Sequence, residues 1–216
     1  MITLKTREEI EGWLDSHKVR HYTINEDLSI DVNGSVDLNK VGLKEIPVRF
    51  RNVSGYFICS QNKLTNLVGC PVSVGGDFYC SKNKLVSLVG CPIQVFNDFV
   101  CIMNRLDSLS SCPESLEIGG DFKCYNNHLT SLVGGPIEIG GDFNCSFNKL
   151  DSLEGCPITI GGNVDCSNNK IGKEELFLYD YSSMQLRQYY NGKNLNEKLQ
   201  ISLAEDMTVI KKKQKL

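Results

Sequence analysis

The sequence predicts an α/β repeat solenoid. Its coils are expected to stack through a concave parallel β-sheet, with an extended or 3₁₀ convex side and helical caps at both ends. Three observations predict this: a repeat of about 21 residues, a helix signal before it, and a leucine-containing segment without the repeat after it. The chain has 216 residues, of which 41% are hydrophobic. No apolar run approaches the roughly 18 residues of a membrane helix, so we expect a soluble protein.

The repeat has the pattern F-x-C-x-x-N-x-L-x-x-L and holds from Phe57 to about Ile171. Its cysteine recurs every 21 residues, with one 23-residue unit between Cys101 and Cys124. The two extra residues lie in the segment SSCPESLEIGG. A second block, V-G-C-P-x-x-V-G-G-D or a close variant, separates the signatures, and a degenerate unit near Val36 opens the array.

This pattern resembles the leucine-rich repeat family, whose general form is L-x-x-L-x-L-x-x-N-x-L, over residues 34–171. Phe78, Cys80, Asn83 and Leu85 occupy the family's second leucine, third leucine, asparagine and following leucine. The longer motif F-x-C-S-x-N-x-L-x-S-L-x-G-C-P is most similar to that of short-repeat proteins of tailed bacteriophages and some bacteria. The resemblance implies a solenoid that binds through its concave sheet, and it says little about biochemical activity.

The residue types explain why each unit should form a coil. The alternating F-x-C segment has the period of a strand buried on one face. The asparagine follows where the chain must turn, and its amide can bond the backbone groups that the turn leaves unpaired, so we expect an internal asparagine ladder. The later leucines face inward, while Cys-Pro and Gly-Gly serve as turns on a narrow return path.

Both ends should cover the array, because end coils cannot bury their own apolar sides. Thr6 and Glu9 form a capping box, which predicts a helix from about Arg7 to His17. A small hairpin over residues 22–32 should follow, with Asn33-Gly34 as a turn signal. We therefore divide the chain into residues 1–33, an N-terminal helix and hairpin cap; 34–171, the array of about seven coils; and 172–216, a helical cap with a basic tail.

The ten cysteines predict core packing rather than chemistry. No C-x-x-C pair occurs, and their spacing places them in two columns along the solenoid, where each acts as a small hydrophobe. The three histidines belong to no catalytic motif, and His128 reads as a solvated surface residue. We predict no enzymatic activity, no cofactor and no metal centre.

An acidic row should run across adjacent strands about 5 Å apart. It consists of the residue before each phenylalanine: Asp77, Asp98, Asp121 and Asp142. Turn chemistry at Gly-Gly-Asp is the first explanation. Cation binding and contact with a basic partner are the alternatives.

A cluster of apolar residues is expected on strand positions that face solvent, and such patches often mark protein contacts. Its members are Ile58, Tyr79, Val100, Ile102, Met103, Tyr125 and Phe147. Repeat three departs most from the template, with Phe96-Asn97 in place of Gly-Gly, Ile102-Met103 after the cysteine, and the insertion near Glu114. These departures indicate either a binding role for repeat three or sequence drift that the fold tolerates.

These observations predict a protein-binding module with the apolar cluster as anchor and the acidic row as rim. If the phage resemblance is informative, the partner is a host bacterial protein, such as a defence component, that is inhibited or redirected in the bacterial cytoplasm. The alternatives are a self-associating assembly protein and an acidic mimic that binds a nucleic-acid-handling protein.

Direct nucleic-acid binding is disfavoured because residues 54–171 carry 7 basic and 11 acidic side chains, a net charge of −4. Lys211, Lys212, Lys213 and Lys215 form a basic tail, which we interpret as a solubilising terminus with contact to an acidic partner or nucleic acid as the alternative.

Overall fold

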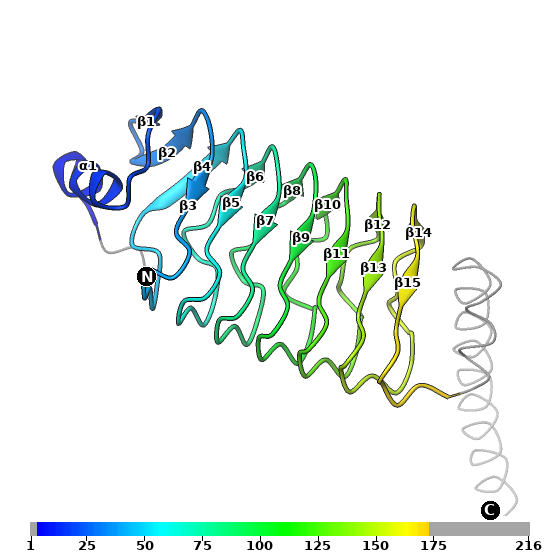
Figure 1. Cartoon of the computed structure of the whole chain (residues 1–216). Helices are drawn as coiled ribbons and strands as arrows, with labels where there is room; N and C mark the ends of the chain where they lie inside the picture. The colour runs from blue at the N-terminus through cyan, green and yellow to red at the C-terminus, as the bar shows by residue number, and fades with distance from the viewer. Residues whose placement is uncertain (1–3, 173–216) are drawn as a thin grey trace, which may run out of the picture. The chain divides into compact units, whose positions relative to one another are not determined.

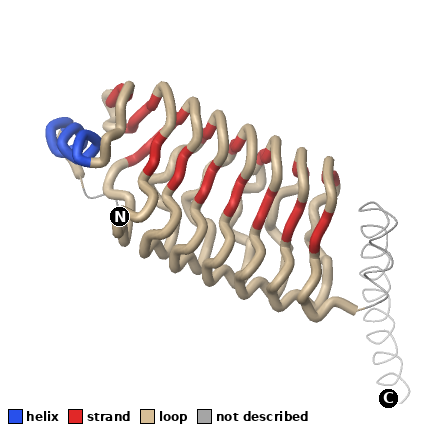
Figure 2. Tube along the Cα trace, viewed as in Figure 1, coloured by secondary structure: helices blue, strands red, loops and turns tan. Residues whose placement is uncertain are grey.

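A computed structural model describes residues 4–172, and these form a parallel β-solenoid of about seven turns with repeats of about 21 residues. Figure 1 shows the coils stacked side by side, each contributing a strand to two separate sheets. Figure 2 shows that short strands alternate with longer loops and that one helix precedes them.

The first sheet, which we call the Phe sheet, contains the predicted F-x-C segments. Its seven parallel strands have the order β15-β13-β11-β9-β7-β5-β3. They are β3 (Val36–Asp37), β5 (Phe57–Ile58), β7 (Phe78–Tyr79), β9 (Phe99–Val100), β11 (Phe122–Lys123), β13 (Phe143–Asn144) and β15 (Val164–Asp165). The pairing joins the same repeat position in adjacent coils, as in Phe57↔Phe78 and Phe78↔Phe99. The predicted parallel sheet and its register are therefore confirmed.

The return path, predicted to be extended or 3₁₀, is extended and forms part of a second sheet. The return path of the coils and the N-terminal hairpin together form an eight-stranded sheet, in the order β1-β2-β4-β6-β8-β10-β12-β14. They are β1 (Tyr22–Ile24), β2 (Ser29–Val32), β4 (Arg49–Val53), β6 (Ser73–Val74), β8 (Gln94–Val95), β10 (Glu117–Ile118), β12 (Glu138–Ile139) and β14 (Thr159–Ile160). Buried aliphatic residues such as Val74 and Ile139 lie in the core just before the Gly-Gly corner. The segment read as an extended or 3₁₀ return is thus a second parallel sheet.

A column of six aromatic rings forms the centre of the core. Phe50 begins the column, and the first residues of β5, β7, β9, β11 and β13 continue it with ring centroids 5.0–5.9 Å apart. All six side chains are buried. Since each ring packs between those of adjacent coils, the column couples the stability of neighbouring coils.

The predicted asparagine ladder is also confirmed. Asn104 lies at its middle and is 7% exposed. Its Nδ2 donates to the Cys101 and Cys80 carbonyls at 3.0 and 3.1 Å, and its Oδ1 accepts from the Leu85 amide at 3.2 Å. Asn62, Asn83, Asn127, Asn148 and Asn169 repeat this arrangement. The ladder satisfies backbone groups that the turn leaves inside the coil.

Helix α1 (Arg7–Ser16) has the predicted capping box, with the Glu9 amide donating to Thr6 Oγ1 at 3.2 Å. Its buried residues are Ile10 and Leu14, and the Trp13 ring lies 6.3 Å from that of Phe50. The predicted hairpin pairs β1 with β2 in antiparallel fashion. Strand β2 then pairs in parallel with β4, so the hairpin extends the second sheet.

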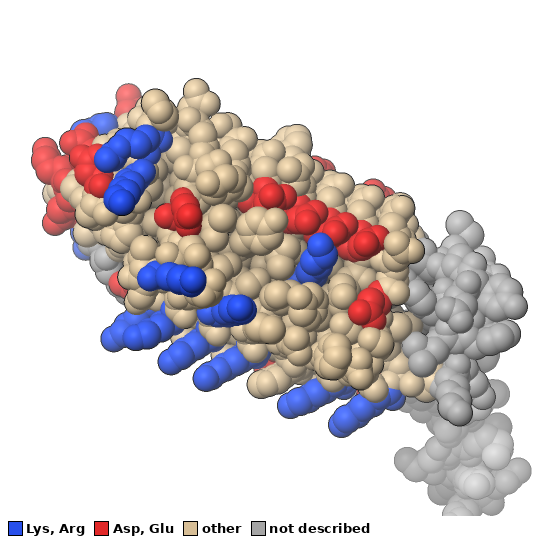
Figure 3. All heavy atoms as spheres, in the orientation of Figure 1, with Lys and Arg blue, Asp and Glu red and all other residues tan. Residues whose placement is uncertain are grey.

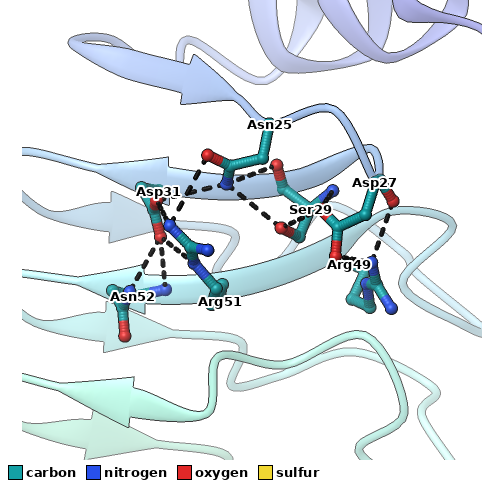
Figure 4. Close-up of polar contacts among 7 residues, drawn as sticks. All are labelled: Asn25, Asp27, Ser29, Asp31, Arg49, Arg51 and Asn52. Atoms are coloured by element: carbon teal, nitrogen blue, oxygen red, sulfur yellow. Dashed lines mark hydrogen bonds and ion pairs between the residues drawn. The ribbon is translucent and has the colours of Figure 1, made fainter.

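Ion pairs join the hairpin to the first full coil on the outer face of the second sheet (Figure 4). Arg49 Nη2 lies 2.5 Å from Asp27 Oδ2, and Arg51 contacts both carboxylate oxygens of Asp31. The Arg51 hydrogen bond holds the pKa of Asp31 below its usual value. These pairs are partly exposed, so each contributes little to the stability of the fold.

The predicted helical cap and basic tail at residues 172–216 lie outside the described residues, except for Gly172. No helix in the described range is long and apolar enough to cross a membrane. The insertion in repeat three forms a turn in which the Leu116 amide donates to the Pro113 carbonyl at 3.0 Å. The strand register continues past it, with Ile118 paired with Val95.

Candidate protein-binding surfaces

The acidic row follows the corner between the two sheets, and its carboxylates bond the backbone of the next coil. Asp98 Oδ1 accepts from the Asp121 amide at 2.8 Å, and Asp121 Oδ1 accepts from the Asp142 amide at 2.7 Å. Asp77 and Asp142 make the same contact with Asp98 and Asn163. The row therefore has a structural role, which is to join each coil to the next.

One lysine lies against the middle of this row. Lys123 Nζ is 2.7 Å from Asp121 Oδ2 and 3.7 Å from Asp98 Oδ2. Its hydrogen bond, followed by that of the Asp142 amide, lowers the pKa of Asp121. In the same region, burial and then the charge of Asp77 raise the pKa of Tyr79. Within residues 4–172, no group of three or more His, Cys, Asp or Glu could hold a metal ion.

The predicted apolar cluster lies on and beside the outer face of the Phe sheet, and we call it the front patch. Met103 and Phe147 are the most exposed of its members, at 45% and 53%. Ile58, Tyr79, Ile102 and Tyr125 are half-buried. Val100 is only 7% exposed, which corrects its assignment as a solvent-facing anchor. It pairs in register with Tyr79 and Lys123, and the Lys123 side chain reaches across its coil toward Asp98.

Met103 and Phe147 share a column whose backbone is left-handed. The second residue after the cysteine has φ near +55° in every repeat: Gln61, Lys82, Met103, Asn126, Phe147 and Asn168. This conformation costs an ordinary residue roughly 1–2 kcal/mol, and asparagine tolerates it best. Two of the coils do use asparagine there. Phe147 and Met103 therefore place large exposed apolar groups where the turn favours a small polar residue.

A groove of about 610 Å³ lies on the outer face of the second sheet, and the sequence did not reveal it. Its lining includes Phe96, Leu116 and Ile137, together with the inserted residues Glu114 and Ser115. Two departures of repeat three from the template, Phe96 and the insertion, thus meet at one site. Phe96 and Ile137 are 57% and 51% exposed.

Phe96 occupies a corner position that four other coils fill with glycine, at Gly75, Gly119, Gly140 and Gly161, and the first coil with Ser54. A Cβ atom added at Gly119 or Gly140 would lie 2.1 or 2.0 Å from a carbonyl oxygen of the preceding coil. The corner must open to admit Phe96. The Asn97 amide accordingly lies 3.3 Å from the Gly76 carbonyl, against 2.8–3.0 Å for the equivalent bonds of other coils.

Charged side chains are segregated on the solenoid surface. Figure 3 shows one acidic line crossing the coils and basic side chains gathered along the lower edge. The residue after each ladder asparagine is exposed and cationic or histidine: Lys63, Lys84, Arg105, His128, Lys149 and Lys170. His128 is thus on the surface, as predicted.

The cysteines lie in the two predicted columns, and all ten are thiols. Eight are buried, while Cys156 and Cys166 are partly exposed. Burial raises the pKa of Cys80, Cys124 and Cys145 well above the usual thiol value, and that of Cys156 to about 12. Such thiols remain protonated near neutral pH and pack as small hydrophobes.

The described residues form a two-sheet parallel β-solenoid with exposed apolar side chains in both the front patch and the groove. No protein-family profile, curated protein or solved structure matches the chain.

Proposed function

We propose that the protein is a non-enzymatic binding module that holds another protein against the front patch. One observation carries this proposal: Met103 and Phe147 are exposed apolar side chains at left-handed positions, where they cost folding energy and bury little. Exposed apolar groups that do not serve the fold are typical of protein contacts. Tyr79, at the end of β7, and Tyr125, two residues beyond β11, are half-buried and supply the aromatic surroundings of such an anchor.

The acidic row enters this proposal as a polar rim. Each carboxylate uses one oxygen for the next coil. The other oxygen is available to a partner except at Asp98 and Asp121, which Lys123 approaches, and at Asp77, which bonds the Tyr79 side chain. The sequence resemblance directs the search for that partner to host bacterial proteins. Blocking a host surface by stoichiometric binding is the simplest mechanism, because it requires no reactive group.

Capture of partners from bacterial lysate, with and without phage infection, tests this function. We expect the tagged protein to retain a stoichiometric partner. The Met103→Asn/Phe147→Asn variant should lose at least about 90% of that partner, because both apolar anchors are removed. Its turns should stay intact, because asparagine holds the same position in two other coils. Quantitative mass spectrometry measures the captured amount.

The matched control is Val86→Asn, which removes an apolar side chain that is 53% exposed but lies outside both surfaces. It should retain the partner. Equal capture by the wild type and the double variant would refute the front patch, and recovery of only the protein itself would favour the self-associating alternative.

A further inference from the structure

The groove on the second sheet has the dimensions of a site for a short extended chain. Its floor is formed by residues of β8, β10, β12 and β14, which belong to four successive coils. Adjacent strands lie about 4.8 Å apart, so the floor is about 14 Å long. An extended peptide rises about 3.3 Å per residue, and about four residues therefore fit along it.

The apolar wall of the groove carries its largest exposed side chain at an unfavourable position. Phe96 replaces the corner glycine, lengthens a bond between coils and remains 57% exposed. Ile137 continues the wall from the next-but-one coil, and Leu116 lies buried at the floor. A partner that covers Phe96 would recover apolar burial that this chain leaves unused.

The charged side chains of the groove have one sign. Glu114 comes from the insertion, Glu117 from β10 and Glu138 from β12, and all three are exposed. The lining, all of it within the described range, includes no lysine, arginine or histidine. Glu117 Oε2 accepts a hydrogen bond from the neutral Gln94 Nε2 at 3.0 Å. No lysine or arginine within residues 4–172 forms an ion pair with any of the three carboxylates.

We propose that this groove is a second binding site, separate from the front patch, which takes an extended segment of a partner protein carrying an apolar residue between basic ones. The apolar residue packs against Phe96 and Ile137, and the basic residues pair with Glu117 and Glu138. Charge complementarity selects this occupant over an acidic or purely apolar segment.

Fluorescence anisotropy with two labelled probes tests the proposal: a peptide of about eight alternating lysines and leucines, and its counterpart with glutamate in place of lysine. At low salt the full chain should bind the lysine peptide at least about tenfold more tightly than the glutamate peptide. Phe96→Gly, which restores the template, should weaken that binding at least about tenfold. Glu117→Gln/Glu138→Gln should weaken it about three- to tenfold and reduce its salt dependence.

Two controls separate the groove from general attraction. Glu154→Gln/Asp151→Asn makes the same charge change at exposed positions outside the groove, and Met103→Asn/Phe147→Asn removes the front patch; both should bind the lysine peptide like the wild type. Binding that is equal for both peptides, or weakened equally by the control pair of acidic substitutions, would overturn the proposal. Absence of peptide binding together with self-association that Phe96→Gly abolishes, measured by light scattering, would instead assign the groove to a second copy of the chain.

Discussion

Phe99→Ala should destabilise the protein by about 3–5 kcal/mol, the range for removing a large buried aromatic side chain. Phe99 is fully buried at the middle of the aromatic column, with the rings of Phe78 and Phe122 at 5.0 and 5.4 Å. The cavity would lie between two coils that cannot close without breaking the register of both sheets. Equilibrium urea unfolding, followed by circular dichroism, measures the loss.

Phe96→Ala is the matched control for that change. It removes the same side chain three residues earlier, where the ring is 57% exposed. We expect its free energy of unfolding to stay within about 0.5 kcal/mol of the wild type or to rise, because an exposed ring contributes little to the core. A difference of less than about 1 kcal/mol between the two variants would contradict the aromatic column as the centre of the core.

Asn104→Ala should cost about 2–4 kcal/mol, because it leaves buried amides without an acceptor. Asn104 Oδ1 accepts from the amides of both Asn83 and Leu85. The Cys80 carbonyl keeps a second donor in Asn83, and the Cys101 carbonyl keeps one in Asn127. The cost therefore comes mainly from the two backbone amides that lose the Asn104 oxygen.

Asn97→Ala provides the comparison, since Asn97 is an exposed corner residue. It should change the free energy of unfolding by less than about 0.5 kcal/mol. Urea unfolding of both variants decides the question. If Asn104→Ala lowered the free energy of unfolding no more than Asn97→Ala, the asparagine ladder would not contribute to the stability of the fold.

The sequence was sufficient for the Phe sheet because three signals agree in each unit: alternation across F-x-C, the asparagine turn, and a constant period. The second sheet was not predicted, because β6, β8, β10, β12 and β14 are only two residues long and all but β8 are followed by Gly-Gly, which is typical of a turn. One inward aliphatic residue, such as Val74, is too little for a strand pattern. Backbone pairing between coils, rather than local propensity, makes these segments strands.

The front patch shows where residue patterns stop being informative. Alternation assigns Val100 to the outer face, but exposure also depends on how far neighbouring side chains reach, and Lys123 extends toward Asp98 over that position. The groove was missed for a related reason. Phe96 and Glu114 are eighteen positions apart, and only the stacking of coils places them at one site. Their departure from the repeat was the available signal.

The central claim is that Met103 and Phe147 serve binding and not folding, and the free energy of unfolding of the Met103→Asn/Phe147→Asn variant tests it most directly. Asparagine relieves the left-handed turn at both positions, so we expect the variant to be as stable as the wild type or up to about 2 kcal/mol more stable in urea unfolding. A loss of more than about 1 kcal/mol would show that these side chains support the fold, and would contradict the account.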